Sequence, residues 1–541
     1  MESLTNQIIS DFKDAGVTVY FGVQGGACAR IIEAVIKNNC KYIPVLNEQA
    51  AGYAAHGYFL THGMPAGIIL TTGPGVTNSI SGIASCYYDS VPLVVLMGQV
   101  NAPLNLAKTF STKMHGFQEL PHIDLVKPVS SVSLSIRSEA DYASQRHAIF
   151  HLLEDKKKVV SLEIQDDVQR IEIKKMKSIS KLTKITNNEL LNKNNQAKLE
   201  SDLLILGAGC RDSLSEADID NINLSEVPVV LSWGAQSLSS QLKYCRGLFG
   251  THTPGVANEL VKKSVSPIVV GCSLLQHQIG KNQKLFLPKA KLITFVNSNP
   301  SENHRAFSIF GDRLFPYLSD ASEFFRRNSL IINKKLNSIE NEQYNIGNPV
   351  VPNILSDVIK KFSKYGTNIF TDAGATLSWS YQAMNMDNNW KLGSKMYSSF
   401  NLHPMGFSNC ALVGSGVNSN DVTLAIIGDG SVPMNCQELA HLKNKKNLKI
   451  VVIDNKGYGI IRQTQDDFYG GVYLGSSFET ESPLPYFSIG KIAKGFDLTY
   501  KVVKNTDYDL KLIDNFFTGD DQILIFDVNK NLKVLTDFYN S

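Results

Sequence analysis

Short apolar runs alternate with longer amphipathic stretches along most of this chain. In the first third, glycine-, proline- or asparagine-containing turns separate these runs, and the stretches between them have helical length and spacing. The expected strands are residues 17–22, 42–46, 67–71 and 92–97, and the expected helices are residues 4–15, 29–37 and 50–60. This alternation predicts a doubly wound parallel sheet with helices on both of its faces.

Two polar passages, residues 174–196 and 328–348, interrupt the pattern and are predicted to be linkers. A length of 541 residues supports about three or four domains. The further expected strands are residues 227–231, 266–271, 291–296 and 368–370, and a further helix is expected at residues 354–362. We therefore predict an α/β protein with three doubly wound parallel-sheet domains, at residues 1–172, 195–325 and 348–541.

Composition narrows the class of protein. Lysine and arginine number 53 against 50 aspartate and glutamate, so the net charge of +3 favours neither a nucleic-acid partner nor an acidic one. The eight cysteines form no Cys-x-x-Cys pair, which suits reduced thiols. No signal peptide is evident at Met1-Glu2-Ser3-Leu4, and the apolar runs are too short to span a bilayer. We predict a soluble cytoplasmic protein without a membrane or nucleic-acid partner.

The most informative polar residues lie in the third domain. Gly428-Asp429-Gly430-Ser431 follows an apolar run, and Asp454-Asn455-Lys456-Gly457 follows the next one, with a helix expected at residues 435–442 between them. A right-handed crossover would place both strand ends side by side. One carboxylate, one amide oxygen and one backbone carbonyl suit Mg²⁺ bound to phosphate oxygens. Taken alone, such residues are also typical of an ordinary α/β turn.

Glu48 is the second candidate. It follows the apolar run at residues 42–46 and precedes a helix rich in small residues. A carboxylic acid that ends a strand and faces a cleft can be desolvated and prepared for proton transfer. Alone, the Asn47-Glu48 pair is more often a helix start.

Several segments, taken in order, identify a family. The Asp429 and Asn455 segments resemble the thiamin-diphosphate motif that begins Gly-Asp-Gly and ends in Asn-Asn, although Asp454 replaces the first Asn. The further segments are FGVQGGA at 21–27, NEQAAGYAAHGY at 47–58, TTGPGVTN at 71–78 and VPLVVLMGQV at 91–100. The chain resembles the acetohydroxyacid (acetolactate) synthase group of thiamin-diphosphate enzymes, strongly in its first and last thirds and weakly in the middle.

The resemblance implies a role for each matching residue. Asp429, Asn455 and the Gly457 carbonyl would hold Mg²⁺. Glu48 would hydrogen-bond the aminopyrimidine of the cofactor and activate it, and Gln118, in Phe117-Gln118-Glu119, would reach the active site. The residues expected to contact thiamin diphosphate are Gly25, Gly73, Asn78, His403, Met405, Gly428, Gly430, Ser431, Tyr458 and Gly459.

Alternatives stay open at several of these positions. The glycine at 73 also suits a tight turn between strand and helix. Met405 is expected to wedge the cofactor into a bent shape, or else to be core. Gln118 is otherwise a surface amide, and His403 is a substrate contact or proton donor, or neither. Thr464 stands where the family commonly has an aromatic residue, which leaves the shape of the substrate channel open.

The middle domain departs most from the family, whose members commonly bind FAD there. The Gly-x-Arg-Phe-Asp-Asp-Arg-like segment corresponds to residues 271–278, where the arginines and the aspartate pair are missing. Residues 247–253 still resemble a glycine-rich loop of the family, or form a plain turn. FAD is therefore possible but disfavoured.

The predicted reaction is decarboxylation of a 2-oxo acid, with pyruvate expected, and transfer of the two-carbon carbanion to an acceptor carbonyl. No pair of adjacent histidines supplies a proton to that carbanion, which favours capture by a second carbonyl compound. The rivals are a 2-oxo-acid decarboxylase that does not ligate and a non-catalytic protein that retains the fold. In this family the site lies between the pyrimidine domain of one subunit and the diphosphate domain of its partner, so a homodimer or homotetramer is expected.

Overall fold

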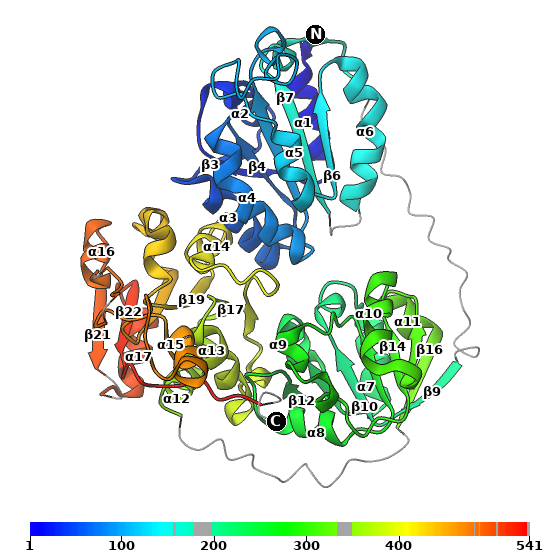
Figure 1. The fold of residues 1–541 in the computed structure, drawn as a ribbon, viewed down its shortest axis with the longest axis vertical. Coiled ribbons are helices and arrows are strands. Elements are labelled where there is room, and N and C mark those ends of the chain that lie inside the picture. The colour runs from blue at the N-terminus through cyan, green and yellow to red at the C-terminus, as the bar shows by residue number, and fades with distance from the viewer. Residues whose placement is uncertain are drawn as a thin grey trace.

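A computed structural model describes residues 1–154, 158–177, 197–332, 349–480, 482–485, 487–504 and 507–537. It contains three six-stranded parallel sheets, one in each part of the chain, and helices flank each sheet (Figure 1). The predicted class, three doubly wound α/β domains, is confirmed. The predicted domain starts at 195 and 348 lie outside the described residues, as does most of both predicted linkers.

The N-terminal sheet has the strand order β3-β2-β4-β5-β7-β6. Its strands are β2 (Val19–Gly22), β3 (Lys41–Pro44), β4 (Ala66–Leu70), β5 (Leu93–Gln99), β6 (Val132–Ile136) and β7 (Val159–Gln165). Its helices are α1 (Leu4–Asp14), α2 (Ala29–Lys37), α3 (Glu48–His62), α4 (Pro74–Tyr88), α5 (His122–Val126) and α6 (Glu139–Glu154). A short antiparallel pair, β1 (Glu2–Ser3) with β8 (Glu172–Ile173), closes the unit. The predicted elements of this unit are confirmed with small shifts at their ends.

The C-terminal sheet repeats the same topology, with the strand order β18-β17-β19-β20-β22-β21. Its strands are β17 (Gly366–Thr371), β18 (Lys395–Tyr397), β19 (Val422–Gly428), β20 (Leu448–Asp454), β21 (Tyr500–Lys504) and β22 (Ile523–Asp527). Its helices are α12 (Val350–Phe362), α13 (Ala375–Asn385), α14 (Phe407–Ser415), α15 (Gly459–Tyr469), α16 (Ile489–Gly495) and α17 (Leu510–Thr518).

The crossover between β19 and β20 is helical, as predicted. It is the 3₁₀ helix η11 (Val432–Leu442), and it is broken at Asn435, where φ is −142° and ψ is 41°. Asn435 donates instead to the Gly406 carbonyl at 3.2 Å. An asparagine side chain that bonds outside its own helix competes with helical geometry, which explains the break.

The middle sheet has a different strand order, β12-β11-β10-β13-β14-β15, which is that of the dinucleotide-binding doubly wound fold. Its strands are β10 (Leu203–Leu206), β11 (Val229–Leu231), β12 (Cys245–Leu248), β13 (Pro267–Val270), β14 (Ile293–Val296) and β15 (Leu314–Tyr317). Its helices are α7 (Glu216–Leu224), α8 (Val256–Lys263), α9 (Gln276–Ile279), α10 (Pro300–Phe310) and α11 (Ala321–Arg327). The polar passage predicted from 328 instead begins with β16 (Asn328–Ile332), which pairs with β9 (Ala197–Ser201) and buries Leu330.

Short 3₁₀ helices complete the described secondary structure. They are η1 (Gly26–Cys28), η2 (Ala102–Leu104), η3 (Lys127–Val129), η4 (Val168–Arg170), η6 (Ala208–Cys210), η7 (Trp233–Gln241), η8 (Gln283–Leu285), η9 (Gly311–Arg313) and η10 (Met386–Leu392). Across the described ranges, no helix combines the length and the apolar character that a membrane span needs.

The first and third units meet through helices with small residues. A Cβ added at Gly57 of α3 would overlap the backbone of Ala411 in α14, and one at Gly414 would overlap the backbone of Ala54. Within the first unit, Gly52 of α3 meets Gly82 of α4 in the same way. Because the backbones approach this closely, the start of α3 is fixed relative to the C-terminal sheet.

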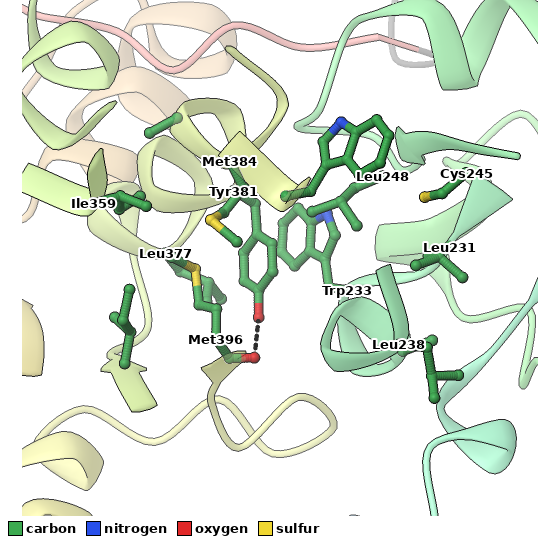
Figure 2. Close-up of a cluster of buried hydrophobic side chains, with 14 of the residues drawn as sticks. Leu231, Trp233, Leu238, Cys245, Leu248, Ile359, Leu377, Tyr381, Met384 and Met396 are labelled. Atoms are coloured by element: carbon green, nitrogen blue, oxygen red, sulfur yellow. Dashed lines mark hydrogen bonds between the residues drawn. The ribbon is translucent and has the colours of Figure 1, made fainter. Parts of the chain in front are cut away.

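The middle and C-terminal units share an apolar interface (Figure 2). Trp233 of η7 stacks on Tyr381 of α13, with ring planes parallel and centroids 4.7 Å apart. The Tyr381 hydroxyl donates to the Met396 carbonyl at 3.2 Å, so the buried phenol keeps a hydrogen bond. The C-terminal segment also reaches the middle unit, where Asp537 accepts from Lys262 at 2.9 Å.

Candidate active site

Three oxygen-bearing groups converge where β19 and β20 end. Asp429 directly follows β19, and its backbone N–H donates to the Ile453 carbonyl at 3.1 Å, which ties it to β20. The backbone N–H of Gly457 donates to Asp429 Oδ2 at 2.7 Å. In the orientation that satisfies its hydrogen bonds, the Asn455 amide nitrogen donates to Asp429 Oδ1 at 2.9 Å and to the Gly457 carbonyl oxygen at 3.0 Å.

The groups that meet here are of the kinds that Mg²⁺ takes as ligands in proteins: a carboxylate, a side-chain amide and a backbone carbonyl. Across the described residues, no group of three or more His, Cys, Asp or Glu side chains could hold a metal ion.

Burial sets the charge state of Asp429, which is 2% exposed. Burial and the nearby Asp454 carboxylate raise its pKa to about 7. Hydrogen bonds from the N–H groups of Gly457 and Gly430 and the charge of Arg462 act in the opposite direction, to lower the pKa. A bound cation would favour the ionised carboxylate, because the opposite charge would then lie at contact distance.

Asp454, which replaces the family's first Asn, stands outside this oxygen set. Its Oδ2 accepts from Lys456 Nζ at 2.7 Å, and the same Nζ lies 3.0 Å from Asp527 Oδ1. Lys456 therefore pairs with the additional carboxylate.

Several residues that were predicted to contact thiamin diphosphate lie around Asp429. A Cβ on Gly430 would lie 2.5 Å from Tyr458 Cε1 and 3.3 Å from Met405 Cε, so both side chains lie over this glycine. A Cβ on Gly459 would overlap the Asn455 amide, and one on Gly428 would lie 3.0 Å from Thr376 Oγ1. Neighbouring side chains can approach the backbone of this loop so closely only because these positions are glycine.

Asp372, which the sequence analysis missed, fixes the segment that carries Met405. It follows β17 and is fully buried, and it accepts from Gly406 N at 2.9 Å and Ser408 N at 2.7 Å. Burial raises its pKa to about 6, although these N–H groups and the Ser431 hydroxyl favour the ionised form. Its position after a buried parallel strand was the available signal, and Ser431 joins the site through this contact.

Arg462 is a second residue that the sequence analysis missed, and it hydrogen-bonds the backbone of the loop that carries Asn455. Its guanidinium donates to the carbonyls of Asn455 at 2.7 Å, Lys456 at 2.8 Å and Lys530 at 2.6 Å. A planar fork that joins three carbonyls fixes the backbone of the loop, and with it the direction of the Gly457 carbonyl.

Glu48 is the first residue of α3, so it both starts the helix and lies at the expected place. It is only 9% exposed. Asn47 caps the helix by accepting from Gln49 N at 2.9 Å. Asn78 Nδ2 donates to Glu48 Oε2 at 3.1 Å, which joins two of the predicted site residues.

Gly73 and Gln118 also lie side by side. Gly73 has φ of +70°, and a Cβ there would be 2.8 Å from Gln118 Cβ. Gln118 itself has φ of +60°. Gly25 packs against the Thr71 side chain at the edge of the same turn.

His403 is the predicted residue that turns toward another unit. Its ring lies 5.5 Å from that of His277, edge to face, and His277 belongs to the middle domain. Burial lowers the pKa of His403, which favours a neutral ring. This placement gives His403 an interdomain contact.

The first turn of the middle domain is occupied by its own chain. Asp212 stands where a dinucleotide fingerprint that begins at Gly207 would have its third glycine. The N–H groups of Gly207 and Gly209 donate to the carbonyls of Val270 at 2.8 Å and Gly271 at 3.0 Å. These two backbone donors are therefore already bonded within the chain.

Comparison with known families agrees with this arrangement. Residues 3–125 match the thiamine pyrophosphate enzyme N-terminal TPP binding domain, and residues 372–525 match the C-terminal TPP binding domain. Together the two matches span just over half of the chain and contain both halves of the site. The chain belongs to the thiamine pyrophosphate enzymes.

Similar proteins narrow the kind of enzyme. The acetolactate synthase large subunit of Lactococcus lactis subsp. lactis (strain IL1403) is 25% identical, over 96% of this chain and 91% of its own length. The probable acetolactate synthase large subunit of Methanocaldococcus jannaschii is 28% identical, over 87% of this chain and 84% of its own. Acetolactate synthase 2, chloroplastic, of Nicotiana tabacum is 26% identical, over 87% and 74%. The chain is a thiamin-diphosphate-dependent, acetolactate synthase-like enzyme.

Proposed function

We propose that the enzyme decarboxylates pyruvate with thiamin diphosphate and Mg²⁺ and transfers the two-carbon unit to an acceptor carbonyl, which yields acetolactate when the acceptor is a second pyruvate. The observation that carries this proposal is the convergence of Asp429, Asn455 and Gly457 where β19 and β20 end, in a chain whose two matched domains are thiamine pyrophosphate binding domains. When bound, thiamin diphosphate supplies the carbanion that attacks the 2-oxo acid and holds the electron pair left after CO₂ departs.

The residues of the C-terminal domain and those of the N-terminal domain would have different functions in the reaction. Asp429, Asn455 and Gly457 would bind the metal, and Tyr458 and Met405 would contact the cofactor. Glu48 would hold a proton at the pyrimidine ring nitrogen. Its burial and its hydrogen bond from Asn78 keep water away and fix the carboxyl orientation.

Gln118 favours ligation over release of an aldehyde. A neutral amide does not protonate a carbanion, but its N–H can donate to the acceptor carbonyl oxygen, where negative charge develops as the new carbon–carbon bond forms. His403, whose pKa is lowered by burial, is poorly suited to deliver a proton instead.

A homodimer or homotetramer is part of the proposal, with each site shared between subunits. Exposed apolar side chains flank both halves of the site: Phe110, Met114 and Phe117 beside Gln118, and Phe468, Tyr469, Val472 and Leu474 beyond the metal loop. Exposed apolar side chains gathered beside a site are typical of protein interfaces, which supports their burial by a second copy. FAD is not part of the proposal, because residues 271–278 lack the arginines and the aspartate pair of the family's segment.

Product analysis tests the proposal. The protein is incubated with thiamin diphosphate, Mg²⁺ and pyruvate, alone and with a panel of carbonyl acceptors, with and without FAD, and products are identified by mass spectrometry. A carbon–carbon product that needs no FAD is expected. Acetaldehyde alone would identify a simple decarboxylase, and failure to bind thiamin diphosphate would favour a non-catalytic protein.

Glu48→Gln tests the assigned proton function. Turnover is expected to fall by about 10²–10⁴-fold, the usual contribution of general acid–base catalysis, while cofactor binding persists. Glu33→Gln is the matched control, because Glu33 is an exposed carboxylate paired with Arg30 and Lys37. Unchanged turnover in Glu48→Gln would contradict the mechanism.

A further inference from the structure

A buried polar cluster that the proposed mechanism does not use lies beneath Gln118. Thr72 follows β4, Gln99 ends β5, His122 begins α5 and Glu163 lies in β7. Their exposed fractions are 4%, 1%, 0% and 6%. Four polar side chains from four elements are costly to bury together unless their hydrogen bonds are satisfied.

The hydrogen bonds define the tautomer of His122. The backbone N–H of Gly73 donates to His122 Nε2 at 3.2 Å, so this nitrogen carries no proton. The proton is then on Nδ1, which lies 3.2 Å from Glu163 Oε2. Although burial acts to raise the pKa of Glu163, hydrogen bonds from His122, Ser135 and Gln99 hold it below its ordinary value. Glu163 thus orients the imidazole of His122 toward the Gly73 turn.

The same cluster fixes the backbone on both sides of Gln118. Thr72 Oγ1 donates to the Gln118 carbonyl at 2.9 Å, and Gln99 Nε2 donates to the Leu120 carbonyl at 2.9 Å. On the other side, the Glu119 carboxylate accepts from the N–H groups of Ala107, His115 and Gly116 at 2.9, 2.9 and 2.8 Å.

Gln118 needs this support because of its backbone conformation. Its φ of +60° is in the left-handed region, which a residue with a Cβ holds only when its surroundings enforce it. The neighbouring Gly73 also has positive φ and packs on the Gln118 side chain. Strain at a residue beside the proposed reaction site points to a requirement for one orientation of its amide.

We infer that His122, oriented by Glu163, is a positioning residue. It holds the Gly73 turn and Gln118 in fixed contact with each other, so that the Gln118 amide is held toward the acceptor carbonyl. The inference rests on the proposed function and adds to it a determinant of product choice. Loss of the His122 contact should impair use of the acceptor more than capture of the first 2-oxo acid.

The test compares His122→Phe, Gln118→Ala and the double variant. We expect His122→Phe to lower the ratio of ligated product to aldehyde about tenfold and to raise KM for the acceptor, with little change in thiamin diphosphate affinity. Gln118→Ala should act the same way. The double variant should be no worse than Gln118→Ala, because both changes remove one coupled interaction.

His122→Gln is the conservative control. Its amide oxygen can accept from Gly73 N–H while its NH₂ donates to Glu163, so it should restore most of the product ratio. Should His122→Phe fail to fold, Glu163→Gln replaces it, since that change removes the acceptor of His122 Nδ1 and should lower the product ratio in the same direction. Effects of His122→Phe and Gln118→Ala that multiply in the double variant would overturn the inference.

Hydrogen–deuterium exchange separates this inference from the proposed function. Backbone amides at residues 116–120 should exchange faster in His122→Phe than in the unsubstituted protein, whether or not the enzyme turns over. Absence of turnover in the unsubstituted protein would reject the proposed function alone. Unchanged exchange at these amides would reject the positioning inference alone.

Discussion

Each residue of the proposed metal site would supply one oxygen atom, and the neighbouring groups determine whether that oxygen faces the site. Without a cation, the Asn455 amide is best turned with its nitrogen toward Asp429 and Gly457, where it donates two hydrogen bonds. With Mg²⁺, the oxygen must face them instead. Arg462 holds the carbonyls of Asn455 and Lys456 in this loop.

Adjacent residues provide a matched test of this site. Asn455→Ala removes one of the three oxygens, so we expect the Kd for thiamin diphosphate with Mg²⁺ to rise at least a hundredfold, or about 2.8 kcal/mol. Asp454→Asn should change that Kd by less than about threefold, because Asp454 pairs with Lys456 outside the oxygen set. Calorimetric titration measures both. Equal losses in the two variants would contradict the assigned ligand set.

At this scale, the sequence predicted the residues that end adjacent parallel strands. Asp429 and Asn455 follow such strands, so their proximity follows from the crossover rule. Arg462 and His122 could not be found this way, because their partners are main-chain groups brought close only by folding, such as Lys530 O and Gly73 N. Asp372 obeyed the strand-end rule and was nonetheless missed.

At the scale of elements, helices α3, α4 and α14 join the N-terminal and C-terminal units of one chain. Their contacts are backbone to backbone at Gly52, Gly57, Gly82 and Gly414. The crossover η11 adds polar contacts beside Glu48, where Glu438 Oε1 accepts from Leu46 N at 2.9 Å. The small residues of α3 were visible in the sequence, whereas the helix that packs on them was not, because small residues do not specify their partner.

Gly414→Ala should therefore be disruptive. The new methyl would overlap the Ala54 carbonyl, so we expect a loss of about 1–3 kcal/mol of stability together with reduced turnover as the start of α3 shifts. Gly495→Ala, at the end of α16, is the control, because a Cβ there meets no atom within 4 Å. Thermal unfolding and steady-state kinetics measure the two effects, and equal melting temperatures for the two variants would contradict this account of the packing.

At the scale of the whole molecule, the three units meet at a buried cluster of charged and polar groups. His56 Nε2 lies 3.8 Å from Asp89 Oδ2 in the first unit, and Asp89 Oδ1 accepts from Asn401 N of the third at 2.9 Å. Arg211, after β10 of the middle unit, interacts electrostatically with both His56 and Asp89. The three domains were evident from the sequence pattern, but this junction was not, since its members are far apart in the chain.

The junction should make the protein sensitive to acid through His56. Burial and Arg211 lower its pKa to about 3, so below about pH 6.5 the unfolded chain gains a proton that the folded one excludes, and stability falls. Asp89 acts oppositely: burial raises its pKa to about 6, so the folded state binds its proton first and gains stability as pH falls toward 4. His56→Asn isolates the histidine effect, because an amide can keep the hydrogen bond to Ser85 without titrating.

We expect His56→Asn to lower Tm at pH 7.5 and to lose less stability than the unsubstituted protein on going to pH 5, by about 2 kcal/mol for one excluded proton. Thermal unfolding across that range measures the difference between the two Tm curves. His147→Asn, on the exposed face of α6, is the control and should run parallel to the unsubstituted protein. If the His56→Asn curve is also parallel, proton exclusion at the junction does not limit acid stability, and the three units are held mainly by the Trp233–Tyr381 interface and the glycine contacts of α3 and α14.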